Sequence, residues 1–122
     1  MKILIVEDDH FFQHFYTTKL KEFGYELAIA QDGIEALAKI KEFQPDLILL
    51  DIIMPNKDGF QVLDEVGKEY LSKVPVLVFS TLGQESDVQK ALSMGARDFV
   101  NKSFFDFDLF LKKVFSYLPQ KQ

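Results

Sequence analysis

The chain has 122 residues, of which 48% are hydrophobic and 27% charged, and its formal net charge is −5. This size predicts a single globular domain over residues 1–122, and the negative charge disfavours direct binding to nucleic acid. The absence of cysteine excludes disulfides and Cys-ligated zinc. Because there is neither a long apolar run nor a charged-then-apolar leader, we expect no membrane insertion and a cytoplasmic protein.

Five short apolar runs alternate with five segments of helical spacing. The expected strands are Lys2–Val6, Tyr25–Ala30, Asp46–Asp51, Pro75–Ser80 and Asp98–Lys102. The expected helices are His10–Phe23, Ile34–Phe43, about ten residues from Gly59 or Phe60, Glu85–Met94 and Asp106–Leu118. Right-handed crossovers place each helix over a parallel sheet. We therefore predict a doubly wound α/β fold with a five-stranded parallel sheet, five helices and the flavodoxin-like strand order 2-1-3-4-5.

Carboxylates follow the first and third expected strands. Glu7 and Asp8 follow the first strand, and Asp51 closes the third. A parallel sheet can place these strand ends side by side, at the edge where such folds bind ligands. Crowded carboxylates need a compensating charge, and Mg2+ prefers oxygen ligands of this kind. The alternative interpretation is that Asp8 and Asp9 only cap the helix that begins at His10.

A hydroxyl and an ammonium group converge on the same edge, because Ser80 ends the fourth strand and Lys102 ends the fifth. A carboxylate can attack phosphorus when cations neutralise the oxygens of the transferring group. Taken singly, Lys102 is more often a solvated lysine and Ser80 a capping or turn residue. Their placement beside the acids favours phosphoryl chemistry.

Over nearly its whole length the chain resembles the receiver domain of two-component response regulators, in the stand-alone form of chemotaxis regulators. The matching features are Glu7-Asp8, Asp51 followed by Met54-Pro55 and Asp58-Gly59, Ser80-Thr81, and Gly95-Ala96 leading through Asp98-Phe99 to Lys102. The resemblance implies that Asp51 accepts the phosphoryl group. It also implies that Mg2+ is ligated by Asp8, Asp51 and the backbone carbonyl of Ile53, with Glu7 assisting through water.

The same resemblance assigns the switch and the partners. Lys102 would contact the phosphoryl group, Ser80 would move to hydrogen-bond it, and Phe99 would be the aromatic residue that rotates. The phosphodonor would be a sensor histidine kinase or a histidine phosphotransfer protein. The output would be a downstream protein, or a second copy of the chain, bound through the fourth helix, fifth strand and fifth helix. The frayed look of the last residues favours a stand-alone receiver.

One departure from the family concerns Lys102. The family usually has Lys-Pro here, often with a cis peptide bond that aims the lysine, whereas this chain has Lys102-Ser103. A cis bond before a residue other than proline costs about 2.5–4 kcal/mol, against about 0.5–1 kcal/mol before proline. The local sequence therefore does not favour the cis form.

Two other functions compete with the phosphorylation switch. The first is a Mg2+-dependent phosphohydrolase with an aspartyl nucleophile, which would need a general acid two residues after Asp51, where Ile53 stands. The second is a degenerate receiver that acts only as a binding module, which the complete set of charged site residues disfavours. As a switch, the chain would catalyse only its own phosphorylation and dephosphorylation, so we do not expect an enzyme.

Two further groups of residues have open interpretations. His10 and His14 lie one helical turn apart and could share a metal, but no third ligand is evident, so we favour a surface or partner-contact role. In the last expected helix, Leu109 falls opposite the apolar stripe and is a candidate for the output surface. Phe104 and Phe105 either fold back onto the start of that helix or face a partner.

Overall fold

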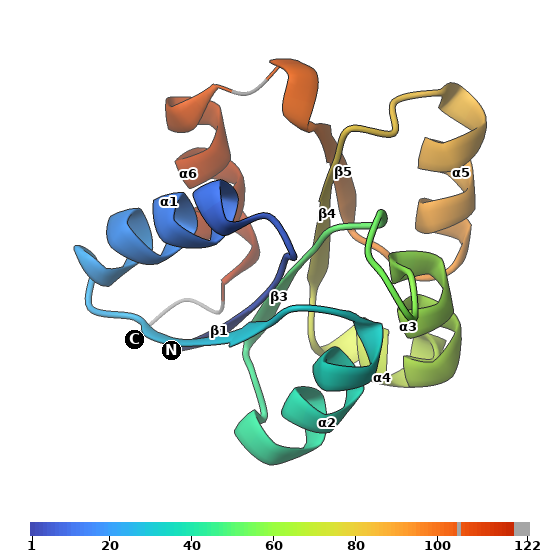
Figure 1. Ribbon diagram of the computed structural model, residues 1–122, viewed down its shortest axis with the longest axis horizontal. Helices are drawn as coiled ribbons and strands as arrows, with labels where there is room; N and C mark the ends of the chain where they lie inside the picture. Colours follow the sequence, from blue (N-terminus) through green and yellow to red (C-terminus); the bar gives the residue numbers. More distant parts are fainter. Residues whose placement is uncertain (105, 119–122) are drawn as a thin grey trace.

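The computed structural model describes residues 1–104 and 106–118, and its strands form one parallel sheet (Figure 1). The strand order is β2-β1-β3-β4-β5, which confirms the predicted doubly wound fold and its order. The strands are β1 Lys2–Val6, β2 Glu26–Ala30, β3 Leu47–Leu50, β4 Val76–Ser80 and β5 Asp98–Asn101. Each lies within one or two residues of its predicted bounds, because an apolar run between polar residues marks a buried strand locally.

The described residues contain six α-helices rather than the five predicted, and the difference lies after β3. The helices are α1 His10–Lys21, α2 Gly33–Phe43, α3 Gly59–Val66, α4 Lys68–Lys73, α5 Glu85–Ser93 and α6 Phe107–Tyr117, with a 3₁₀ turn at Lys102–Phe104. Gly67 separates α3 from α4 with φ 86° and ψ 152°, a conformation that glycine adopts without steric cost. The fourth and fifth helices of the sequence analysis are therefore α5 and α6.

Helices cover both faces of the sheet. In Figure 1, α1 and α6 lie on one side of the strands, and α2, α3, α4 and α5 lie on the other. The alternation of side chains along β1 explains the two layers: Ile3 and Ile5 pack with Leu20 and Val114 beneath α1 and α6, whereas Leu4 and Val6 belong to the opposite core. Both cores are apolar, so each helix buries its apolar stripe against the sheet.

The register of the sheet brings the carboxyl ends of its strands to one edge. Val6 pairs with Leu50, and Ser80 pairs with Asn101, so the residues that follow β1, β3 and β5 emerge close together. The Asp51 amide donates to the Val6 carbonyl at 3.0 Å and extends the pairing by one residue. In the part of the chain that the structure describes, no helix has the length and apolarity needed to cross a membrane.

Candidate functional site

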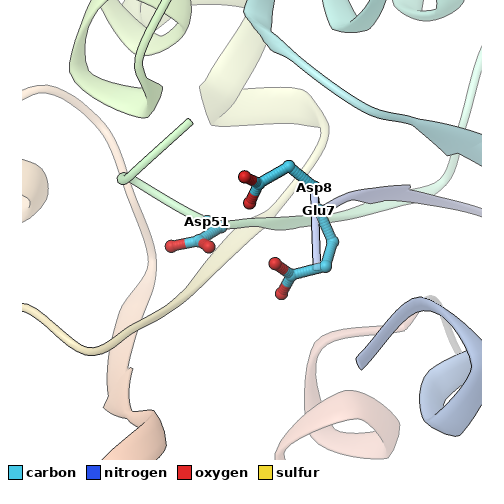
Figure 2. A group of neighbouring side chains, drawn as sticks. All are labelled: Glu7, Asp8 and Asp51. Carbon is cyan, nitrogen blue, oxygen red and sulfur yellow. The ribbon is translucent and has the colours of Figure 1, made fainter. Parts of the chain in front are cut away.

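Three carboxylates meet at the carboxyl ends of β1 and β3 (Figure 2). Ligand oxygens of Glu7, Asp8 and Asp51 all lie within 4.8 Å of one another. Glu7 and Asp51 are buried, with 1% and 6% of their surface exposed, whereas Asp8 is exposed. This juxtaposition was predicted from the strand ends, and it sets two buried carboxyl groups beside a third that reaches solvent.

Asp9, and not Asp8, caps α1. The Asp9 side chain accepts hydrogen bonds from the amides of Phe11 and Phe12, at 2.8 and 3.3 Å. Its own amide donates to Oε2 of Glu7 at 3.2 Å. The capping alternative therefore applies to Asp9, and the Asp8 carboxylate stays with the acidic group.

Lys102 supplies a positive charge to the buried acids. Its Nζ donates to Oε1 of Glu7 and to Oδ2 of Asp51, the second at 3.0 Å, and only 4% of its side chain is exposed. The same Nζ lies 4.4 Å from the centroid of the Phe12 ring. The Lys102–Ser103 peptide is trans, as are the other described peptide bonds. One ammonium group is thus shared between two buried carboxylates.

Burial raises the pKa of the Glu7 carboxyl from its ordinary 4.5 to about 7. The hydrogen bond from Lys102 opposes that rise, and the nearby charge of Asp51 adds to it. A carboxyl with such a pKa has a marginal charge at neutral pH until a further cation arrives. A cation bound at this cluster would favour the charged form of the carboxyl and so lower its pKa.

Asp51 is held in place by backbone contacts on two sides. Its Oδ1 accepts a hydrogen bond from the Ile53 amide at 3.2 Å. On the other side α3 begins at Gly59, where a Cβ would lie 2.6 Å from the Asp51 carbonyl oxygen. Only glycine allows the first turn of α3 to pack this closely against the end of β3. The Asp51 carboxylate consequently sits on rigid elements rather than on a free loop.

A depression of about 250 Å³ opens over the acids. Its walls come from the three acids, Lys102 and four further residues: Asp9, Phe12, Ile53 and Thr81. The sequence analysis did not single out Phe12 as a site residue; its position one helical turn after Asp8 was the available signal. Thr81 entered only as part of the Ser80-Thr81 motif.

The two expected switch residues lie beside this depression rather than in its walls. Ser80 is fully buried at the end of β4, and its Oγ accepts a hydrogen bond from the Leu82 amide at 3.2 Å. Phe99 is half-buried in β5 and packs against the core beneath α2, α3 and α5. Both are thus adjacent to the site through their strands, and the Ser80 hydroxyl faces its own loop.

Other concave regions offer less chemistry. His10 and His14 line a separate depression with Gln13, Thr17 and Ile29, and no third metal-ligating side chain joins them among the described residues. A depression of about 480 Å³ between α2 and the α3–α4 segment is larger than the acidic one, but its walls are mainly apolar. Larger volume without converging polar groups is a weaker indication of catalysis than the acids and Lys102.

Comparison with known families gives one match over most of the chain. Residues 3–115 match the family described as the response regulator receiver domain. Curated relatives include the probable transcriptional regulator ycf27 of Cyanophora paradoxa, 39% identical over 103 residues, which are 84% of this chain and 42% of that protein. The same-named protein of Guillardia theta is also 39% identical, over 84% of this chain and 40% of its own length. The chain thus spans about two-fifths of the relatives it matches.

Solved structures of similar fold share the whole architecture. The chemotaxis protein CheY4 of Vibrio cholerae has a TM-score of 0.86 and 30% identity, covering 96% of this chain and 98% of its own. In the CheX–CheY–BeF3–Mg2+ complex of Borrelia burgdorferi, a matching chain has a TM-score of 0.86 and 33% identity, with coverages of 95% and 87%. The BeF3-activated receiver domain of Klebsiella pneumoniae RstA has a TM-score of 0.86 and 26% identity, with coverages of 98% and 100%.

Proposed function

The chain belongs to the response regulator receiver domain family, and from this premise we propose that Asp51 accepts a phosphoryl group from a phosphohistidine donor and thereby switches a protein-binding surface. One observation carries the proposal: the Asp51 carboxylate lies at a sheet edge with Lys102 Nζ 3.0 Å away and two further carboxylates within 4.8 Å. Nucleophile, cation and metal-ligating oxygens are thereby assembled in one depression.

In the proposed step, an Asp51 carboxylate oxygen attacks the phosphorus of the donor. A new O–P bond forms while the P–N bond to the donor imidazole breaks, and the imidazole leaves with that electron pair and takes up a proton. In the same step we propose that Lys102 turns its ammonium group from Glu7 and Asp51 to an oxygen of the transferred group. The Ile53 amide holds the other carboxylate oxygen and so orients the nucleophile.

The donor set fits Mg2+, because it consists of hard oxygen atoms on rigid strand ends. We assign Asp8, Asp51 and the Ile53 carbonyl as ligands, with Glu7 acting through water. When bound, the ion would neutralise the crowded carboxylates and the oxygens of the phosphoryl group. The matching Borrelia burgdorferi chain, described in a complex with BeF3 and Mg2+, supports this assignment.

We propose that the effect of phosphorylation reaches the protein-binding surface through β4 and β5. Ser80 would move toward the phosphoryl group, and Phe99 would rotate with the loop that follows β4. The surface so altered consists of α5, β5 and α6, where Leu109 is 46% exposed. We propose that it binds a downstream protein or a second copy of the chain. The longer curated relatives are named probable transcriptional regulators. That role belongs to the longer proteins and is not part of the function proposed for this chain.

The two rival functions have less support. Ile53 occupies the position where a hydrolase would need its general acid, and its side chain lines the depression as an apolar wall. A binding module without chemistry would not need a buried ammonium group shared between two buried carboxylates, an arrangement that is costly to maintain. The phosphorylation switch uses every one of these groups.

The proposal is tested by incubating the purified chain with acetyl phosphate and Mg2+, followed by mass spectrometry. We expect an adduct with the mass of one phosphoryl group, which hydroxylamine removes because it is an acyl phosphate. Asp51→Asn should abolish the adduct and leave the circular dichroism spectrum unchanged, because the two side chains have the same shape. Asp58→Asn is the matched control, since Asp58 lies on the same loop but caps α3. Continued labelling of Asp51→Asn at the normal rate would show that another residue is the nucleophile.

A further inference from the structure

Two buried hydroxyl groups on α1 have no hydrogen-bond partner among the described residues, Tyr16 Oη and Thr17 Oγ1. Tyr16 is 1% exposed, so its hydroxyl cannot turn to solvent. A buried polar group without a partner is rare in native proteins, and each such group calls for an explanation. A phenylalanine would fill the same space without the free-energy cost of an unpartnered hydroxyl. The Tyr16 hydroxyl therefore indicates a role beyond packing.

The surroundings of Tyr16 indicate whether its hydroxyl acts as a donor or an acceptor of a hydrogen bond. Its ring is flanked by four aromatic rings. It stacks on Phe110 with centroids 5.2 Å apart, is tilted against Phe12 and Phe79 at 5.8 and 6.1 Å, and meets Phe15 edge-on at 6.0 Å. Beyond burial, the pKa of this hydroxyl is raised by the charges of acids at the site, foremost Glu7. Tyr16 is therefore a neutral hydrogen-bond donor, and the acids of the site are near enough for their charges to act on it.

Tyr16 is also joined to the site through Phe12, one helical turn earlier. The Phe12 ring contacts Tyr16 on one side and carries Lys102 Nζ 4.4 Å from its centroid. The hydroxyl, the ammonium group and the Glu7 carboxylate thus belong to one packed region between α1 and the sheet. A movement of Lys102 changes the environment of all of them.

Glu7 has few donors for a carboxylate that is almost completely buried. In the described structure its Oε1 accepts from Lys102 and its Oε2 from the Asp9 amide at 3.2 Å, although a carboxylate offers about four acceptor positions. Lys102 is shared with Asp51, the proposed phosphoacceptor. When Lys102 turns to the phosphoryl group, Glu7 loses this donor while its side chain stays buried, and a Mg2+-bound water would fill only one of its acceptor positions.

We propose that Tyr16 is a positioning residue whose hydroxyl donates a hydrogen bond to the Glu7 carboxylate when Lys102 turns to the phosphoryl group. The inference rests on the proposed function, because it assigns Tyr16 to the phosphorylated state of the same site. The unpartnered hydroxyl destabilises the resting chain and gains its partner on phosphorylation. The replacement of Lys102 by Tyr16 as hydrogen-bond donor to Glu7 therefore biases the equilibrium toward the phosphorylated arrangement.

The experiment compares Tyr16→Phe with Thr17→Val, which removes the other unpartnered hydroxyl of the same helix. The probe is beryllofluoride with Mg2+, with binding measured by calorimetry and by fluorine NMR. We expect Tyr16→Phe to weaken beryllofluoride binding about tenfold, the scale of one hydrogen bond to a charged group. Thr17→Val should bind it as the unmodified chain does. In EDTA, without the probe, both variants should resist urea at least as well as the unmodified chain.

A second readout does not depend on affinity. In the beryllofluoride complex of the unmodified chain, we expect a slowly exchanging hydroxyl proton of Tyr16 in the proton NMR spectrum, which Tyr16→Phe removes. Binding by Tyr16→Phe within twofold of the unmodified chain would overturn the inference. So would an equal loss in Thr17→Val, or a loss of urea resistance in EDTA as large as the loss of affinity, because Tyr16 would then be structural.

These outcomes are distinguishable from failure of the proposed function. If the unmodified chain neither binds beryllofluoride nor takes up phosphoryl from acetyl phosphate, the proposed function fails, and this inference fails with it. If the unmodified chain does both, and Tyr16→Phe does both equally well, the proposed function stands and only the role of Tyr16 is wrong.

Discussion

Replacing Lys102 by methionine tests whether its charge holds the acidic site together. The substitution keeps an unbranched side chain of similar length beside Phe12, so packing changes little, but it removes the only ammonium group that contacts Glu7 and Asp51 in the described structure. The side chains of these two acids are 2% and 7% exposed. Removing one partner of a buried ion pair costs about 3–5 kcal/mol, because the other charge is left buried without compensation.

We expect Lys102→Met to lower the free energy of unfolding by about 3–5 kcal/mol at neutral pH in EDTA, as measured by urea denaturation. Lys113→Met is the matched control. Lys113 pairs with Asp98 at 2.5 Å, but their side chains are 28% and 25% exposed, so the loss should be at most about 1 kcal/mol. Added Mg2+ should stabilise both variants by binding their folded acidic site, and Lys102→Met more than the control, because there the ion also replaces the missing positive charge.

The pH dependence follows from Glu7, whose pKa is raised from 4.5 to about 7 in the folded chain. Between these values the folded chain binds more protons than the unfolded chain, so stability falls as pH rises. The contribution of Glu7 is fully present below pH 4.5 and is lost by about pH 7. Lys102 opposes the rise in the pKa of Glu7, so without it the fall should extend to higher pH. A loss in Lys102→Met that stays within about 1 kcal/mol of the control, or one that is larger at acidic than at neutral pH, would refute the reasoning.

Three other experiments have simpler expected outcomes. Asp8→Ala should lower Mg2+ affinity at least tenfold in calorimetry, whereas Asp9→Ala should mainly cost about 1 kcal/mol of stability through the lost cap; equal losses of Mg2+ affinity would mean that the ligands are misassigned. Changing Ile53 to Asn and Leu82 to Glu together should shorten the lifetime of the phosphorylated chain at least tenfold, because both apolar residues leave an attacking water unoriented; an unchanged decay of the phosphoryl label would contradict this. Leu109→Ser should change stability by less than about 0.5 kcal/mol and leave phosphorylation intact, yet weaken self-association or partner binding in sedimentation experiments; undiminished binding would exclude Leu109 from the output surface.

Much of this architecture could be predicted from the sequence, because its causes are local. Runs of four or five apolar residues that end in acids identify β1 and β3, and alternation with helical segments requires a parallel sheet. The meeting of Glu7, Asp8 and Asp51 follows from the same rule, since parallel strands end at one edge. The motifs then identify the receiver family, which the match over residues 3–115 confirms.

Other features depended on contacts between distant parts of the chain. Lys102 contacts Glu7 across 95 positions and Asp51 across 51, and no local pattern sets how one ammonium group is divided between them. The interruption at Gly67 is a similar case, because an isolated glycine in a helical pattern can be tolerated or can end the helix. The placement of Phe105 and of the Phe104 side chain lies outside the described residues, so their interpretation stays open.

Tyr16 shows the boundary between the two kinds of information. Tyr16 is one of the apolar residues that recur at helical spacing between His10 and Phe23, which is enough to indicate the inner face of α1, since an aromatic ring gains free energy by leaving water. Whether its hydroxyl has a hydrogen-bond partner depends on which rings and carboxylates the rest of the fold places around it. Burial of apolar surface is non-directional and can be read from a sequence pattern. Hydrogen bonds and buried charges require defined distances and angles, so only the tertiary structure decided them.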